Sequence, residues 1–270
     1  MVVLKGVLKT GLRAALRIPV LDRAMLALIQ TRSQSPWSRR HPYDVANNNV
    51  QTSGTLTGRL LTAEGTTAYG AAQPSILRQA FATIPSRRDC HFIDLGCGMG
   101  RPLLVATEFD FAAITGVEIS PALGRAARRN ADRFQRLHPN RRTIEIVIGD
   151  ALGYELPTRK MVVFLYNPFD ENAMRRLLQK IETSLAADPR EFYIVYYNPV
   201  WASLLDASPW FERRYAAQLS YHQSEIGFGP DESDAVVVWQ NMGNPHPLPP
   251  GDAGAPVKVV RQGVSARVGV

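Results

Sequence analysis

Residues 91–102 read HFIDLGCGMGRP, and this stretch decides the fold. Apolar and aromatic residues lead into Asp94, three glycines follow at every second position, and a helix-like run begins at Leu103. This order predicts a buried strand, a tight glycine turn and a helix whose free N–H groups face the turn. A ligand can therefore approach the backbone at a point where a Cβ atom would otherwise collide with it.

The acid beside the glycines limits the kind of ligand. A dinucleotide-binding turn reads G-x-G-x-x-G. This chain instead has Gly96, Gly98 and Gly100 followed by Arg101, so the third glycine comes one position early. A carboxylate at Asp94 would repel a pyrophosphate and attract a cation. The turn therefore favours a cationic ligand without phosphate and disfavours a nicotinamide cofactor.

Strand-like and helix-like segments alternate after this turn. The pattern predicts strands over 91–95, 113–118, 143–148, 161–166 and 192–197, separated in part by helices over 102–108, 121–137, 170–185 and 200–205. Two late strands, 213–220 and 235–239, have no helix between them and predict a hairpin with one antiparallel strand. We expect an α/β fold with three layers, in which a Rossmann-like sheet of seven strands is mostly parallel.

Five of the predicted strands end in, or directly before, a polar residue: Asp94, Glu118, Asp150, Asn167 and Asn198. In open α/β sheets, ligands bind beyond the carboxyl ends of the strands. Because these five ends would share one edge of the sheet, the sequence predicts a single polar site there.

The charge distribution divides the chain. Residues 1–41 carry eight Lys or Arg and one Asp, whereas residues 42–270 carry 23 charges of each sign. We therefore expect a basic N-terminal arm and linker over 1–41, a domain over 42–242 and a flexible tail rich in Pro and Gly over 243–270. A neutral domain does not predict nucleic-acid binding.

The arm has an amphipathic pattern over residues 2–18, in which leucines recur every four residues and a Lys or Arg follows each of them. Such a helix could lie on an anionic membrane surface or on a partner, or could pack its leucines against the domain. It also resembles an Arg-rich transit peptide, but not a secretory signal, because charges interrupt the apolar run.

The remaining composition points to a cytoplasmic protein, with the arm open to membrane contact. Hydrophobic residues make up 45% of the chain, enough for a sizeable core, yet no apolar run reaches the 18 residues or so that a membrane span needs. Cys90 and Cys97 flank one strand and would lie too far apart for a disulfide. The five histidines have no metal-ligand spacing, so no metal is expected.

The motifs together resemble those of the class I S-adenosylmethionine-dependent methyltransferases. Residues 94–100 (DLGCGMG) resemble their motif I, Glu118 resembles their ribose-binding acid, and residues 149–151 (GDA) resemble their adenine-binding motif. Asn167 stands at the position of their motif IV. The resemblance spans about residues 65–240 and implies S-adenosyl-L-methionine as the cofactor and methyl transfer as the activity.

The resemblance also implies roles for the residues that match. Gly96, Gly98 and Gly100 would bend under the methionine part of the cofactor, and Asp94 would hold its amino group. Glu118 would accept hydrogen bonds from both ribose hydroxyls.

On the adenine side, the resemblance implies that Ile119 packs on the base. Asp150 would bind the amino group of the adenine, and the N–H of Ala151 would reach a ring nitrogen.

Motif IV bears on the methyl acceptor. Amino-group methyltransferases often carry Asp or Asn, two prolines and an aromatic residue there. The Asn and Pro oxygens accept hydrogen bonds from the target nitrogen, and the aromatic ring stacks against the target. Here Asn167, Pro168 and Phe169 are one proline short of that form. The shorter form resembles the seven-strand histone-lysine methyltransferases. Together with residues 196–199 (YYNP), it also resembles a largely uncharacterised bacterial group.

An amino group of a protein or small molecule is the acceptor that we expect, since no Lys or His stands at a strand end as a strong base. A small-molecule O-methyltransferase and a non-catalytic cofactor-binding scaffold remain alternatives. In this family the segment before the first strand often closes over the cofactor. The expected substrate or lid residues are therefore Tyr69, Gln73, Ser75, Tyr166 and Asn198.

Overall fold

The computed structural model describes residues 41–52, 70–85, 87–228, 231–242, 253–261 and 264–268. The amphipathic segment over residues 2–18 and the lid candidate Tyr69 lie outside these ranges, so both expectations stay predictions.

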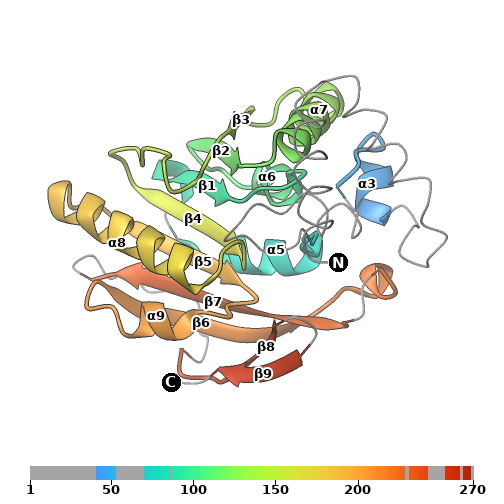
Figure 1. The fold of residues 1–270 in the computed structure, drawn as a ribbon. Helices are drawn as coiled ribbons and strands as arrows, with labels where there is room; N and C mark the ends of the chain where they lie inside the picture. The colour runs from blue at the N-terminus through green and yellow to red at the C-terminus, as the bar shows by residue number, and fades with distance from the viewer. Residues whose placement is uncertain are drawn as a thin grey trace, which may run out of the picture.

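A seven-stranded sheet with the order β3-β2-β1-β4-β5-β7-β6 forms the centre of the domain (Figure 1). Its strands are β1 (His91–Leu95), β2 (Ala113–Glu118), β3 (Ile144–Ile148), β4 (Met161–Tyr166), β5 (Phe192–Tyr197), β6 (Phe211–Ser220) and β7 (Ser233–Asn241). The first five pair in parallel, and β7 pairs antiparallel with both β5 and β6. The predicted Rossmann-like sheet with one antiparallel strand is confirmed.

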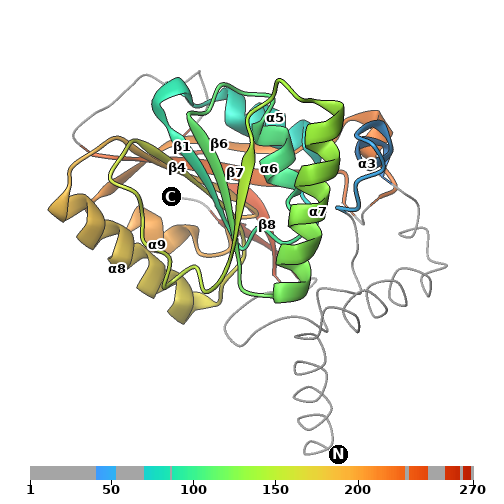
Figure 2. The same ribbon diagram turned by 90° about the horizontal axis from the view of Figure 1, so that it is seen from above.

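Helices cover both faces of the sheet (Figure 2). One face is covered by α5 (Pro74–Ala82), α6 (Arg101–Ala106) and α7 (Pro121–Leu137), and the other by α8 (Glu171–Ala187) and α9 (Ala202–Asp206). Because the β1–β2 and β2–β3 crossovers pass over one face and the β4–β5 crossover passes over the other, the strand order reverses between β1 and β4. Ligands of open α/β sheets bind at this kind of reversal.

Capping residues set where the two long helices begin. The Ser120 side chain accepts from the backbone N–H of Leu123, and Pro121 follows at the first helical position. Asp170 caps α8 in the same way, accepting from the N–H of Ala173 at 2.9 Å. These caps satisfy N–H groups that have no partner inside the helix, and the strand-to-helix boundaries follow the sequence prediction closely.

A short helix, α3 (Pro42–Ala46), lies in a stretch that showed no periodicity in the sequence. Its five residues are too few to display a helical repeat, and it begins at a proline that His41 precedes as cap. Two single 3-10 turns, Arg87–Asp89 and Gln223–Glu225, complete the helical elements of the described residues.

The expectation of a flexible tail over residues 243–270 is wrong for its last part. Strands β8 (Val257–Arg261) and β9 (Val264–Val268) form an antiparallel hairpin. The side chains of Val257 and Val259 are 0% and 2% exposed in the apolar cluster on the α8 side of the sheet. The weak valine run is therefore a strand with one buried face, and the glycines and prolines before it hid that alternation.

None of the helices in the described part of the chain is both long and apolar enough to cross a membrane. Cys90 and Cys97 are both buried and free.

Candidate functional site

The glycine turn after β1 has a backbone that other residues rarely adopt. Gly96, Gly98 and Gly100 have φ angles of +88°, +55° and +87°. A Cβ atom added at Gly96 would lie 2.8 Å from the Cβ of Pro168, which is closer than real Cβ contacts. The predicted cofactor turn and the predicted acceptor motif therefore touch, although more than 70 positions separate them in the sequence.

Asp94 is the second-last residue of β1 and is 2% exposed. Among the described residues, its Oδ2 atom has no hydrogen-bond partner. Burial, and then the nearby Glu118 carboxylate, raise the pKa of Asp94 well above its usual value. A buried carboxylate oxygen without a donor is costly unless a ligand supplies one, so this atom marks a place for a cationic or hydrogen-bond-donating group.

Glu118 at the end of β2 holds the glycine turn. Its two carboxylate oxygens accept from the backbone N–H groups of Gly98 and Ser120, each at 2.8 Å. Burial raises the pKa of Glu118, and these backbone hydrogen bonds oppose that rise. The strand ends of β1 and β2 are thus joined through one side chain, and its carboxylate keeps acceptor capacity for a ligand hydroxyl.

The predicted adenine-side residues follow at the ends of β2 and β3. Ile119 is 40% exposed, which is unusual for isoleucine directly after a buried strand. Asp150 is exposed and accepts from the N–H of Leu152 at 2.9 Å, while Ala151 is buried. An apolar surface and a carboxylate therefore stand on neighbouring strand ends, as a flat heterocycle with an amino group would require.

Asn167 and Phe169 follow β4 with different surroundings. Asn167 is partly exposed, has a φ of +41°, and lies 3.3 Å through its Oδ1 from the hydroxyl of Tyr196. Phe169 is 6% exposed, and its carbonyl accepts from the indole of Trp201 at 3.1 Å. The amide of Asn167 is placed at the site, whereas the ring of Phe169 packs in the core and its stacking on an acceptor stays a prediction.

Asn198, at the end of β5, has a structural task. Its Nδ2 donates to the carbonyl of Val260 at 2.9 Å, and its Oδ1 accepts from the N–H of the same residue at 2.8 Å. Its φ is +48°. The side-chain amide thus makes the two hydrogen bonds that a neighbouring strand would make to β8, and it holds the hairpin. Both of its polar atoms are engaged in this way, which disfavours the substrate role that the sequence suggested.

The segment before α5 lies against the ends of β4 and β5, and its closing over a cofactor stays a prediction. The N–H of Gln73 donates to the hydroxyl of Tyr197 at 3.3 Å, and its Oε1 pairs with Nε2 of His41 at 3.0 Å. A Cβ atom at Gly70 would lie 3.7 Å from the hydroxyl oxygen of Tyr166. Gln73 and Tyr166 are therefore brought to the same edge of the sheet.

Ser75 is fixed at the start of α5 by Glu225, whose carboxylate accepts from its N–H at 2.9 Å and from its hydroxyl. His41 accepts from the N–H of Tyr43 through Nδ1 at 3.2 Å, so Nε2 carries the proton that it donates to Gln73. Burial, and then the Arg101 charge, lower the pKa of His41 to about 4. A neutral imidazole thus anchors this covering segment.

Asp234 is a residue at this edge that the sequence reasoning missed. It is 8% exposed and accepts hydrogen bonds from the hydroxyls of Tyr197 and Tyr221. Burial raises the pKa of Asp234 to about 6, while the two tyrosine hydrogen bonds oppose the rise. Since β7 is antiparallel, its first residues and not its last reach the ligand edge. Searching the beginning of the predicted antiparallel strand would have found Asp234.

Arg101 is the second residue that the sequence reasoning left without a role. Its side chain is 1% exposed, and its guanidinium donates to Thr52 Oγ1 at 2.7 Å and to the carbonyl of Ala72 at 3.1 Å. It also lies 3.5 Å from Oδ1 of Asp44. One buried cation therefore ties α3 and the covering segment to the helix after the glycine turn. An arginine at the start of an apolar helix was the available signal.

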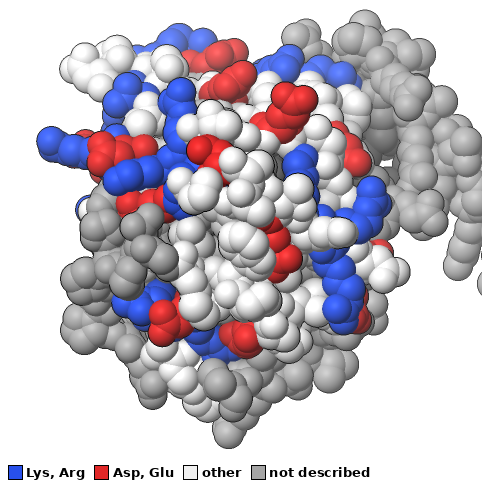
Figure 3. Space-filling model, turned by 90° about the vertical axis from the view of Figure 1, so that its left-hand side faces the viewer, with Lys and Arg blue, Asp and Glu red and all other residues white. Residues whose placement is uncertain are grey.

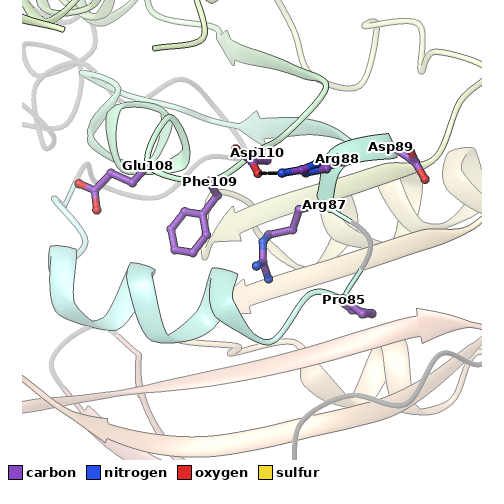
Figure 4. A pocket seen from close by; sticks show the side chains of 7 residues that line it. All are labelled: Pro85, Arg87, Arg88, Asp89, Glu108, Phe109 and Asp110. Atoms are coloured by element: carbon purple, nitrogen blue, oxygen red, sulfur yellow. Dashed lines mark hydrogen bonds and ion pairs between the residues drawn. The ribbon is translucent and has the colours of Figure 1, made fainter. Parts of the chain in front are cut away.

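The opposite edge of the sheet carries a surface cavity of about 370 Å³ (Figure 4). It lies before β1 and β2, and its lining is Pro85, Arg87, Arg88, Asp89, Glu108, Phe109 and Asp110. Arg87 donates to carbonyls at the end of α5, and Arg88 pairs with Asp110. Figure 3 shows charges of both signs interleaved on this face. Its charged groups thus pair within the protein, and the cavity lies away from the glycine turn.

Nowhere in the described ranges do three or more His, Cys, Asp or Glu side chains group as metal ligands would.

The strand order and the placement of the glycine turn define a Rossmann-like fold with a seven-stranded sheet. A family model described as histone methylation protein DOT1 matches residues 59–139. That match includes the glycine turn, Glu118 and Ile119, and it ends before Asp150 and Asn167, so it covers the first part of the predicted cofactor site and not motif IV. A search of curated proteins found no match.

Several solved structures are similar at low identity. A candidate class I methyltransferase of Listeria monocytogenes is 15% identical over 64% of this chain and 61% of its own, less than two thirds of its length, with a TM-score of 0.45. An RNA methyltransferase of Salinibacter ruber, in complex with S-adenosyl-L-homocysteine, is 19% identical over 66% and 99%, with a TM-score of 0.42. The N-methyltransferase NodS of Bradyrhizobium japonicum, in the same kind of complex, is 13% identical over 63% and 87%, with a TM-score of 0.45. The fold assignment rests on the strand order and registers of this chain and not on these scores.

Proposed function

We propose that the protein is an S-adenosylmethionine-dependent methyltransferase and that its acceptor is an amino group of a protein or small molecule. The observation that carries the cofactor assignment is Oδ2 of Asp94, a buried carboxylate oxygen without a donor, placed beside a turn of three left-handed glycines. A cationic ammonium group supplies both the missing hydrogen bond and the compensating charge.

The residues around Asp94 fit the remaining parts of this cofactor. The glycine turn leaves space for a ligand against the backbone, and Glu118 is a carboxylate with remaining acceptor capacity for two neighbouring hydroxyls. Ile119 and Asp150 offer an apolar surface and an acceptor for an adenine. A pyrophosphate would meet two buried carboxylates instead, which is the electrostatic reason for rejecting a dinucleotide.

When bound, S-adenosylmethionine supplies an activated methyl group on a sulfonium. The work of this chain is then to place the acceptor in line and to exclude water. The Oδ1 of Asn167 can accept a hydrogen bond from a neutral amine, and the Tyr196 hydroxyl beside it holds the amide in that orientation. The amide oxygen of Asn167, as an uncharged hydrogen-bond acceptor, suits an amine because it tolerates the positive charge that develops on the amine nitrogen during transfer.

The cofactor assignment is tested by calorimetry with S-adenosyl-L-homocysteine and with NAD. We expect binding of the first and none of the second. Asp94→Ala should weaken binding at least tenfold, because the ammonium group loses its carboxylate. The control Asp89→Ala removes an exposed acid at the opposite edge of the sheet and should bind like the parent protein. A parent protein that binds neither ligand would overturn the proposal.

The acceptor assignment is tested by transfer of a labelled methyl group into a lysate, followed by identification of the labelled species. N-methyl groups and methyl ethers are both stable to alkali, whereas methyl esters are not, so mass spectrometry of the labelled species, together with its alkali lability, separates an N-methyl product from an O-methyl one. Asn167→Ala should abolish transfer and leave cofactor affinity within a few-fold. Cofactor binding without any transfer would favour the scaffold alternative.

A further inference from the structure

The outward face of α7 is the most strongly charged surface of a single element in the described part of the chain. The helix contains five arginines and one acid, Asp132, and no lysine: Arg125, Arg128, Arg129, Arg133 and Arg136. On a helical repeat all five fall on one side of the helix. All are exposed except Arg125, which is half-buried. We call this side the arginine face.

Two of these arginines are held by neutral partners. The Arg128 guanidinium donates to the carbonyl of Ile146 at 2.8 Å, and that of Arg133 donates to the carbonyl of Asn49 at 2.9 Å. A carbonyl orients a guanidinium and leaves its net charge uncompensated. The two side chains are therefore fixed, charged and still supplied with free donors, which is the state in which arginine recognises a phosphate bidentately.

The summed charge of residues 42–270 does not show the arginine face. Residues 42–270 carry 23 charges of each sign, but α7 alone holds five positive charges and one negative. Asp132, the one acid of the helix, lies on the same side, so the arginine face carries four more positive charges than negative ones. A neutral sum is thus compatible with one basic surface, and the expectation that nucleic acid is not bound rested on the sum.

We propose that the arginine face binds the phosphodiester backbone of a nucleic acid. The stretch from Arg125 to Arg136 is about 16 Å long, which matches about five base-pair steps of a duplex. A lipid surface fits less well, because a helix lying on a membrane inserts apolar side chains. The apolar side of α7, including Ala127 and Phe134, is packed on the sheet. The proposal does not depend on methyl transfer.

The test measures binding of the full chain to a fluorescein-labelled 24-base-pair DNA duplex by anisotropy at several salt concentrations. The variant Arg133→Gln/Arg136→Gln is compared with the control Arg175→Gln/Arg176→Gln, which removes two arginines from α8 on the opposite face of the sheet. Glutamine keeps helix propensity. The basic residues 1–41 are present in all three proteins, so their contribution cancels in the comparison.

We expect the α7 variant to bind roughly tenfold more weakly at low salt, with a salt slope smaller by about 1.8, since each lost phosphate contact removes about 0.9. The control should stay within about twofold. Equal losses in both variants, or no loss in either, would overturn the proposal. The proposal would also be overturned if the α7 variant lost binding only to vesicles containing phosphatidylserine, or only to polyglutamate, and kept its binding to the duplex. Unchanged thermal unfolding of each variant shows that a loss of binding does not come from a loss of folding. The single change Arg136→Gln repeats the test with a smaller disturbance of the helix.

Discussion

The ligand edge of the sheet has two halves that use their polar side chains differently. Beyond β1 and β2, Asp94 keeps a carboxylate oxygen without a donor, and Glu118 binds only backbone N–H groups. Beyond β5 and β7, the polar side chains already serve the protein, since Asn198 holds β8 and Asp234 holds two tyrosines. A buried polar atom without a hydrogen-bond partner indicates what a site binds. The half beyond β1 and β2 has such an atom and therefore indicates the charge of its ligand, whereas the half beyond β5 and β7 does not.

Sequence separation accounts for this difference. The cofactor half is made within residues 94–151, where a strand, its turn and the next strand ends follow one another. The acceptor half depends on contacts such as Tyr197 with Asp234, 37 positions apart, and Asn198 with Val260, 62 positions apart. Arg101 joins the halves, because it starts the helix after the glycine turn and holds the covering segment at Ala72.

Breaking that junction should give the largest effect. Arg101→Leu leaves the Asp44 carboxylate buried without its cation, and we expect a loss of about 3–5 kcal/mol in the free energy of unfolding. Denaturant unfolding measures it. The double variant Arg101→Leu/Asp44→Leu should regain part of the loss, because no uncompensated charge remains. A single variant that loses less than about 1 kcal/mol would show that the halves are held together by other contacts.

The contact between the glycine turn and Pro168 should come next. Gly96→Ala places a Cβ atom 2.8 Å from the Pro168 Cβ and forces a φ of +88° on alanine, so we expect a loss of about 1–3 kcal/mol and at least tenfold weaker binding of S-adenosyl-L-homocysteine. The control is Gly153→Ala, where an added Cβ meets only the Asp150 carbonyl oxygen at 3.5 Å, an ordinary contact, and φ is not positive. If both variants bind alike, the turn tolerates a side chain and the two halves do not meet there.

Much of the fold was predictable because its signals are local. Ser120 followed by Pro121, and Asp170 before α8, mark helix starts by capping chemistry. Strands β1, β4 and β5 are buried on both faces and read as apolar runs. For the same reason the positions of Asp94 and Glu118 at adjacent strand ends followed from the alternation of elements.

What could not be predicted depends on partners far away in the chain. Asn167 and Asn198 look alike in sequence, each before a proline, and both have positive φ. Only the structure separates them, since one lies beside a tyrosine hydroxyl at the site and the other pairs with β8. Phe169 similarly became part of the core because Trp201 and the apolar cluster under α8 surround it.

Asn198→Gly tests the structural role of the acceptor half. Glycine keeps the positive φ and removes both hydrogen bonds to Val260, so we expect a loss of about 1–2 kcal/mol and faster hydrogen exchange of the β8 amides. Asn48→Gly makes the same change at an exposed asparagine with a φ of +62° and should leave β8 exchange unaltered. Unchanged β8 exchange in Asn198→Gly would return that amide to the substrate role predicted from the sequence.

The smallest effect is a pH dependence that belongs to the acceptor half. Asp234 has a pKa of about 6 in the folded protein against an ordinary value of 3.8, so between these values the native state holds a proton that the unfolded chain has released. Stability that this proton provides is therefore present below about pH 4, is lost as the pH rises, and changes no further above about 6. One proton limits the slope to about 1.4 kcal/mol per pH unit. Asp234→Asn should flatten this part of the unfolding profile, whereas Glu232→Gln, at an exposed neighbour, should keep it. A profile of Asp234→Asn with the parent slope would mean that another group titrates there, and that the carboxylate of the acceptor half is ionised throughout, as a cationic amine would require.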